Sequence, residues 1–107
     1  MPPPRAASEP AVKRPVRYRF RLFVADHAEN SVRAVANLAD LCKTHLQGRH
    51  EIEIVDVFEE PERALADGIL MTPTLIRLAP LPLRRIIGTL SDARAVLQTL
   101  GLDAEAT

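Results

Sequence analysis

Residues 16–25 alternate between apolar and polar side chains. The apolar positions fall on every second residue: Val16, Tyr18, Phe20, Leu22 and Val24. Arginines occupy the intervening positions up to Arg21, and Phe23 and Ala25 then make the other side apolar as well. Neighbouring side chains of a strand point to opposite faces, so this pattern predicts a β-strand whose second half is covered on both faces.

Residues 32–46 show a different period. Their apolar positions recur three and four residues apart, as on one face of an α-helix: Val32, Val35, Leu38, Ala39, Leu41, Cys42 and Leu46. We expect Asn30 or Ser31 to cap this helix and Gly48 to end it in a left-handed conformation. Cys42 lies within the apolar stripe, which predicts a small core residue rather than a nucleophile.

A second strand and a short second helix follow. Residues 51–58 alternate again, and a helix connects them to the first strand. We therefore expect the two strands to be parallel neighbours joined by a right-handed crossover. Pro61 is tolerated in the first turn of a helix, so residues 61–66 predict a short helix that Asp67 and Gly68 close.

The stretch over residues 69–90 predicts a hairpin. Two apolar runs, residues 74–79 and 86–87, lie on either side of a turn that is bounded by Pro80 and Pro82. The physical expectation is a strand, a tight connection and a second short strand.

Residues on both sides of this hairpin carry local signals. Pro73 has no N–H group and stops any helix before it, and the Thr72–Pro73 bond is a candidate for the cis form. After the hairpin, Ser91 is expected to cap a last helix that ends at Gly101.

The order of these elements is β-α-β-α-β-β-α. Parallel pairing in the first half, a hairpin in the second and helices on both faces predict an α/β domain with a mixed sheet of thioredoxin-like architecture over residues 16–102. Residues 1–15 are rich in proline and charge and predict a disordered arm. Residues 103–107 predict a short polar tail.

Composition narrows the classes of function. The chain has 107 residues and a formal net charge of zero, which gives no general attraction to nucleic acid or to a membrane. No apolar run approaches membrane-spanning length, and the first residues lack the apolar segment of a secretory signal, so a cytoplasmic protein is predicted. The charges are segregated, basic in residues 5–21 and 77–94 and acidic in residues 51–67, which indicates surfaces that recognise partners.

The residues that could carry chemistry do not form a catalytic pattern. Cys42 is the only cysteine, so the loop at residues 26–31 lacks the Cys-X-X-Cys pair that thiol–disulfide exchange requires. His27 and Glu29 could form an acid–base pair, but no nucleophile accompanies them, and the histidines lack metal-ligand spacing. The sequence predicts a binding protein that is not an enzyme and needs no cofactor or metal. A thioredoxin-like redox protein is the alternative.

Several short stretches, taken together, resemble the KaiB family. They are residues 23–25, 30–34, 55–57, 69–75 and 83–88, within a similar region that runs from about Tyr18 to Leu100. The most specific part is Thr-Pro-Thr followed at this spacing by Arg-Arg-Ile-Ile-Gly. KaiB proteins belong to the circadian clock and bind the KaiC ATPase, so the resemblance implies a regulatory binding protein with a KaiC-like ATPase as its partner.

The resemblance also implies two structural states. KaiB proteins have a ground state that forms tetramers and packs the second half of the chain differently, and a monomeric thioredoxin-like state that binds KaiC. Ground-state packing is therefore the alternative fold, and a homo-oligomer, a dimer or tetramer, is an expected association state. A homo-oligomeric scaffold that acts without KaiC is a further alternative function.

The resemblance assigns candidate contacts to four basic positions: Arg33, Arg77, Arg84 and Arg85. Arginine makes forked, charge-assisted contacts that the carboxylates of a partner can meet. We expect these four residues to form the partner-binding surface.

Other positions depart from the clock members of the family. Glu51 and Glu53 stand where those proteins have small and basic residues on a surface tied to KaiA, so KaiA is not an expected partner. Thr99 and Gly101 replace residues associated with the balance between the two folds. These differences are typical of a simpler KaiB–KaiC timer or of a stress-response system.

Overall fold

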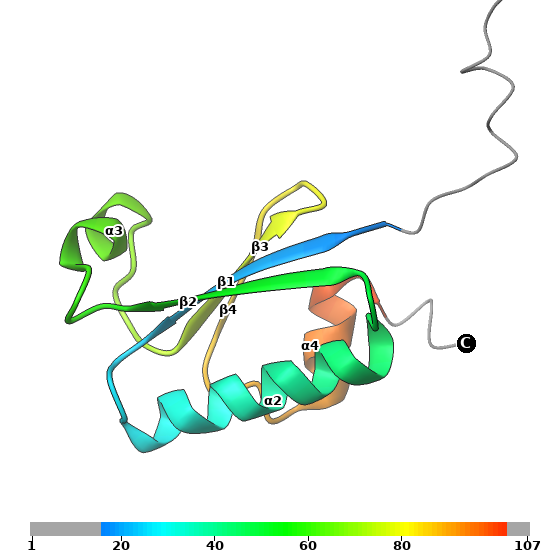
Figure 1. Ribbon diagram of the computed structural model, residues 1–107, viewed down its shortest axis with the longest axis horizontal. Helices are drawn as coiled ribbons and strands as arrows, with labels where there is room; N and C mark the ends of the chain where they lie inside the picture. The colour runs from blue at the N-terminus through cyan, green and yellow to red at the C-terminus, as the bar shows by residue number, and fades with distance from the viewer. Residues whose placement is uncertain (1–15, 103–107) are drawn as a thin grey trace, which may run out of the picture.

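The computed structural model describes residues 16–102, so the arm and the tail predicted for residues 1–15 and 103–107 lie outside the described residues. The described chain forms these elements in order (Figure 1): β1 (Tyr18–Val24), α2 (Glu29–His45), β2 (His50–Asp56), α3 (Pro61–Ala66), β3 (Thr74–Ala79), β4 (Arg84–Ile87) and α4 (Ala93–Leu100). This is the order β-α-β-α-β-β-α that the sequence predicted.

β1 lies inside a mixed sheet of order β2-β1-β3-β4. It runs parallel to β2, with Phe20 opposite Ile52, and antiparallel to β3, with Leu22 opposite Leu75. β3 and β4 form the predicted antiparallel hairpin. The prediction of an α/β fold with a mixed sheet is confirmed, and the order leaves β2 and β4 as the two edge strands.

The main core lies between the sheet and the two long helices, α2 and α4, which cover the same face (Figure 1). β1 contributes its even-numbered side chains, α2 contributes Leu38 and Cys42, and α4 contributes Val96 and Leu100. The apolar stripe predicted for the first long helix is the face that packs here. Removing this apolar surface from water is the main term that favours folding.

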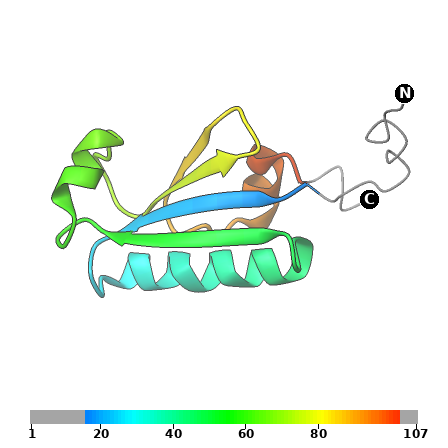
Figure 2. The same cartoon turned by 45° about the horizontal axis from the view of Figure 1, so that its top comes forward.

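The opposite face of the sheet is covered at one end only. α3 packs Ala64 against Phe23, Val55 and Ile76 in a second, smaller core (Figure 2). α3 has six residues and is therefore about 9 Å long, too short to cover the whole face. The prediction of helices on both faces is correct only near the end of β1, and charged side chains occupy the rest.

Both N-cap residues predicted from the sequence are wrong. α2 begins at Glu29, and its N-cap residue, Ala28, makes no side-chain capping bond. The Ser31 hydroxyl is buried and instead accepts a hydrogen bond from the backbone N–H of Ala25 at 2.9 Å, which ties the helix to the end of β1. α4 is capped by a carboxylate, that of Asp92, rather than by the predicted Ser91.

Two chain reversals explain where elements stop. β2 ends at Asp56, two residues before the predicted end, because the Asp56 carboxylate accepts a hydrogen bond from the N–H of Phe58 at 2.8 Å. Such a side-chain bond to the backbone two residues ahead is a turn and competes with strand geometry. Gly101 ends α4 as predicted, with a left-handed φ of 77°.

Candidate partner-binding site

Two of the predicted contact residues, Arg84 and Arg85, lie side by side on the edge strand β4 and are exposed. They face opposite sides of the sheet, because neighbouring strand residues alternate. Arg84 pairs with Arg77 across the hairpin and lies on the α4 side, whereas Arg85 pairs with Ile76 and lies on the α3 side. A partner that meets both must therefore approach the edge of the sheet.

Their hydrogen bonds differ in kind. Among the described residues, the Arg84 guanidinium donates to the carbonyl oxygen of its neighbour Leu83, at 3.1 Å, and this exposed local contact leaves most of the group available. Arg85 reaches across the face and donates to the backbone carbonyl of Asp67, at the end of α3. Arg84 is therefore the less constrained of the two.

Arg77 is not on the surface. Its side chain is buried, with 6% of the residue exposed, and it donates to the carbonyl oxygens of Leu100 at 2.6 Å and Pro82 at 2.8 Å. The prediction that Arg77 is a surface contact is corrected by this burial. The residue instead joins β3 to the end of α4 and to the β3–β4 turn, where a cation complements the negative end of a helix.

Arg33 lies apart from the hairpin, on the second turn of α2. It is exposed and forms an ion pair with Glu29 at 2.8 Å. Asn37, four residues later and so on the same side of the helix, donates to the backbone carbonyl of Thr89 at 2.8 Å, in the segment that follows β4. Arg33 thus shares a side of α2 with the segment after β4, although it does not touch Arg84 or Arg85.

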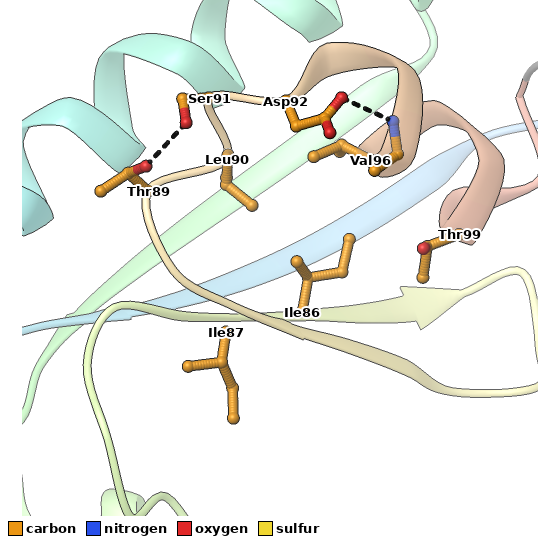
Figure 3. Close-up of a pocket in the computed structure, with 9 residues that line it drawn as sticks. Ile86, Ile87, Thr89, Leu90, Ser91, Asp92, Val96 and Thr99 are labelled. Atoms are coloured by element: carbon orange, nitrogen blue, oxygen red, sulfur yellow. Dashed lines mark hydrogen bonds between the residues drawn. The ribbon is translucent and has the colours of Figure 1, made fainter.

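A groove lies between β4 and α4, on the side of the sheet that Arg84 faces (Figure 3). Its volume is about 310 Å³, and its apolar wall includes Ile86, Leu90 and Val96. Figure 3 shows Ile86 pointing toward α4 and Ile87 pointing to the other side of the strand. The sequence did not predict this groove, because it depends on how the segment after β4 turns back. Leu90, with a φ of 64°, is part of that turn.

A network of ion pairs connects β1, β2 and α3 on the face that Arg85 shares. Arg21 binds Glu53 at 2.8 Å and Asp67 at 3.0 Å, and Arg63 binds the other oxygen of Glu53 at 2.7 Å. These hydrogen bonds, first that from Arg21 and then that from Arg63, hold the pKa of Glu53 below its usual value. Because Arg85 donates to the backbone of Asp67, the predicted contact residue touches this network.

Within residues 16–102, the side chains considered as candidates for chemistry, Cys42 and His27, lie apart from one another. Cys42 is fully buried, and desolvation raises the pKa of its thiol to about 11, so little thiolate forms at neutral pH. His27 is almost fully exposed, and its Nε2 lies 3.5 Å from a carboxylate oxygen of Asp26. Within residues 16–102 no group of three or more His, Cys, Asp or Glu side chains could hold a metal ion. The Thr72–Pro73 bond, the cis candidate, is cis in this structure.

Residues 16–102 thus combine a basic edge strand, a groove beside it and a scaffold of thioredoxin-like topology. A family model described as the KaiB domain matches residues 21–102. The chain belongs to the KaiB family. The resemblance noted from the sequence is thereby confirmed, and the match covers most of the described residues.

Curated relatives agree with this assignment. The chain is 45% identical over 86 residues to a circadian clock oscillator protein KaiB of Synechococcus elongatus, and the match covers 80% of this chain and 82% of the relative. It is 43% identical over 84 residues to the circadian clock protein KaiB3 of a Synechocystis species, covering 78% of this chain and 80% of the relative. Similarity to KaiB clock proteins therefore extends over about four fifths of the chain.

Solved structures show the fold class independently. The N-terminal domain of SasA from Synechococcus elongatus superposes with a TM-score of 0.66 at 19% identity, covering 84% of this chain and 89% of that domain. A chloroplastic thioredoxin z superposes with a TM-score of 0.68 at 20% identity, covering 94% and 90%. At these identities the likeness shows the thioredoxin-like fold of this KaiB-family chain and nothing about its chemistry. None of the described helices is long and apolar enough to cross a membrane.

Proposed function

We propose that this KaiB-family protein is a cytoplasmic regulatory protein, not an enzyme, that binds a KaiC-type ATPase in a circadian, timer or stress-response system. Family membership supports the partner class, and the exposed pair Arg84 and Arg85 on an edge strand is the observation that carries the proposed contact. Arg33 extends this surface on α2. Arg77 is left out of it because its side chain is buried.

The chemistry of this edge favours an acidic surface on the ATPase. Each guanidinium presents a planar fork that matches a carboxylate, and such charge-assisted contacts are stronger than neutral ones. The Arg84 side chain makes one exposed local hydrogen bond, so it gives up little existing bonding when it binds a partner. Arg85 must keep or exchange its bond to the Asp67 carbonyl. We therefore expect Arg84 to contribute more to affinity than Arg85.

Binding to KaiA is not part of the proposal. Glu51 and Glu53 lie on the other edge strand, β2, and Glu51 remains exposed despite long contacts to Arg17 at 3.5 Å and Arg19 at 3.8 Å. The carboxylates would repel an acidic partner at that edge. A homo-oligomer, a dimer or tetramer, and the alternative ground-state packing of the second half of the chain remain proposals that the family suggests.

The test is co-elution of the chain with a KaiC-type ATPase and ATP on a sizing column, followed by affinity measurement. Replacing Arg84 and Arg85 with Glu should weaken the complex at least about tenfold, since each change removes an attraction and adds a repulsion. Arg17→Glu is the matched control for each single replacement, because it makes the same charge change at an exposed position near the other edge strand, β2, where Arg17 contacts Glu51. Equal losses in both variants, or no complex at any nucleotide state, contradict the proposal.

The redox alternative has its own measurement. A thioredoxin-like enzyme would reduce insulin disulfides or peroxide, whereas the buried thiol of Cys42 predicts no turnover. A scaffold without KaiC would instead form a stable oligomer and leave the ATPase unbound on the column. These outcomes separate the three functions.

A further inference from the structure

α3 lies at the end of the molecule seen on the left of Figure 2. Exposed apolar residues lie in this helix and in the segments on either side of it. They come from the loop before α3, from α3 itself and from the segment before β3. The exposed fractions are 71% for Phe58, 81% for Leu65, 94% for Leu70 and 60% for Met71. We call these four residues the α3 patch. Large apolar side chains that cluster in the open are a recognised mark of binding surfaces.

The side chains of the α3 patch are exposed and contribute little buried surface to the fold. α3 fills the second core with Ala64 alone, and Leu65, the next residue, points away from it. Phe58, Leu70 and Met71 instead line a surface pocket of about 180 Å³ whose floor includes Ala64 and Ile69. A partner side chain could enter this pocket. Methionine adapts its shape to a partner more readily than branched residues do.

The rim of the α3 patch is acidic. Residues 56–71 contain one basic residue, Arg63, and these acidic residues: Asp56, Glu59, Glu60, Glu62 and Asp67. Arg63 is already paired with Glu53 and Glu60, and Asp67 with Arg21. Glu59 and Glu62 are exposed and form no ion pair among the described residues. Two carboxylates beside the patch, those of Glu59 and Glu62, are therefore uncompensated among the described residues, whereas Arg85 reaches the end of α3 at Asp67.

We propose that the α3 patch is a second docking surface, and that its occupant is a cationic amphipathic segment of a partner protein. Apolar side chains of that segment would cover Leu70 and Met71 and enter the pocket, while its lysines or arginines face Glu59 and Glu62. Charge complementarity selects this occupant, since an acidic segment would be repelled. The surface is opposite in charge to Arg84 and Arg85, and the inference does not depend on the proposed ATPase partner.

The probe is a synthetic peptide of leucine and lysine whose leucines recur at helical spacing, titrated into the isotope-labelled full chain. Amide chemical shifts should change within residues 56–72, and the changes should weaken in about 0.5 M salt. The same peptide with glutamate in place of lysine should cause no change. Shifts centred elsewhere, or equal binding of the acidic peptide, overturn the proposal.

Variants separate the apolar and the charged contributions. Leu70→Ser should weaken peptide binding about tenfold, because the side chain is covered in the complex but does not support the fold. Glu59→Gln should weaken it about threefold, the size of one exposed charge contact. Leu81→Ser is the matched control, since Leu81 is 76% exposed in the β3–β4 turn. An effect of Leu81→Ser equal to that of Leu70→Ser also overturns the proposal.

Two other occupants have distinct outcomes. If the free chain sediments as an oligomer that Leu70→Ser converts to a monomer, the occupant is a second copy. If deletion of residues 1–15, which carry Arg5, Lys13 and Arg14, shifts the resonances of residues 56–72, the occupant is the chain's own terminus. Either result rejects a separate cationic partner, and neither bears on binding at Arg84.

Discussion

Arg77 and the carbonyl oxygen of Leu100 are joined by a hydrogen bond of 2.6 Å, between the middle of the sheet and the last turn of α4. The same guanidinium holds Pro82 in the β3–β4 turn, and its Nε has no partner among the described residues. One buried side chain therefore determines how the last helix and the hairpin fit together. It lies next to the proposed binding edge but acts by positioning it.

Replacing Arg77 with Met should destabilise the protein by about 2 kcal/mol, because the carbonyl oxygen of Leu100 in a buried bond and that of Pro82 in a partly buried one lose their donor. Arg77→Lys should cause a smaller loss of stability than Arg77→Met, because its ammonium group keeps the charge but cannot reproduce the two-armed geometry of the guanidinium. Urea denaturation measures both. The control is Arg19→Met, at an arginine whose side chain is 59% exposed and which should change stability little. If Arg77→Met leaves stability intact but abolishes partner binding, Arg77 is a direct contact after all.

Ser31→Ala should cost about 1 to 2 kcal/mol in the free energy of unfolding, because it leaves the N–H of Ala25 without its acceptor in a partly buried position. Asn30→Ala is the matched control, one residue away and exposed, and should be nearly neutral. Thermal unfolding of the two variants compares them. A larger loss for Asn30→Ala would mean that this residue, not Ser31, serves the start of α2.

The ion pairs of Glu53 predict a specific dependence of stability on acid. Its folded pKa lies below the unfolded value, because Arg21 and Arg63 donate hydrogen bonds to its charged form. This contribution to stability is fully present above the unfolded pKa, about 4.3, and is lost as pH falls through the folded pKa. Glu53→Gln should make the free energy of unfolding depend less on pH in this range. An NMR titration of the Glu53 carboxyl that gives an ordinary pKa would contradict the network.

Cys42 should react slowly with a thiol reagent such as Ellman's in the native protein and rapidly in denaturant. The thiol is fully buried and its pKa is raised to about 11, so both access and thiolate are limiting. The rate of colour development at mild alkaline pH measures this. Fast native reaction would show that α2 opens away from the sheet, and the fold described above would not be the dominant one.

Much of this fold follows from local pattern. The alternation of β1 and the helical spacing of α2 predicted their types and nearly their ends, and the crossover between β1 and β2 predicted their parallel pairing. Pro73 and the proline-bounded turn predicted the hairpin. These features depend on residues close together in sequence, where the period of apolar side chains and the geometry of proline limit the backbone to few choices.

The candidate site was less predictable. The sequence places Arg77, Arg84 and Arg85 in one basic segment, and nothing in that segment says which of them is buried. The answer depends on α4, whose last carbonyl comes to lie beside β3 and takes the guanidinium of Arg77. The predicted N-cap of α2 failed for a similar reason, since the Ser31 hydroxyl accepts from Ala25, the residue after β1, rather than from its own helix.

The sequence by itself determined the element types, their order and the family. Each of these depends on short stretches of sequence, whose pattern does not depend on which distant element packs against them. Only the tertiary structure decided which arginines remain for a partner and that Leu65 and Leu70 stay in the open around α3. The physical reason is that burial depends on which distant element packs against a residue. The local pattern limits which residues can be buried, and the packing of the sheet against the helices determines which of them are.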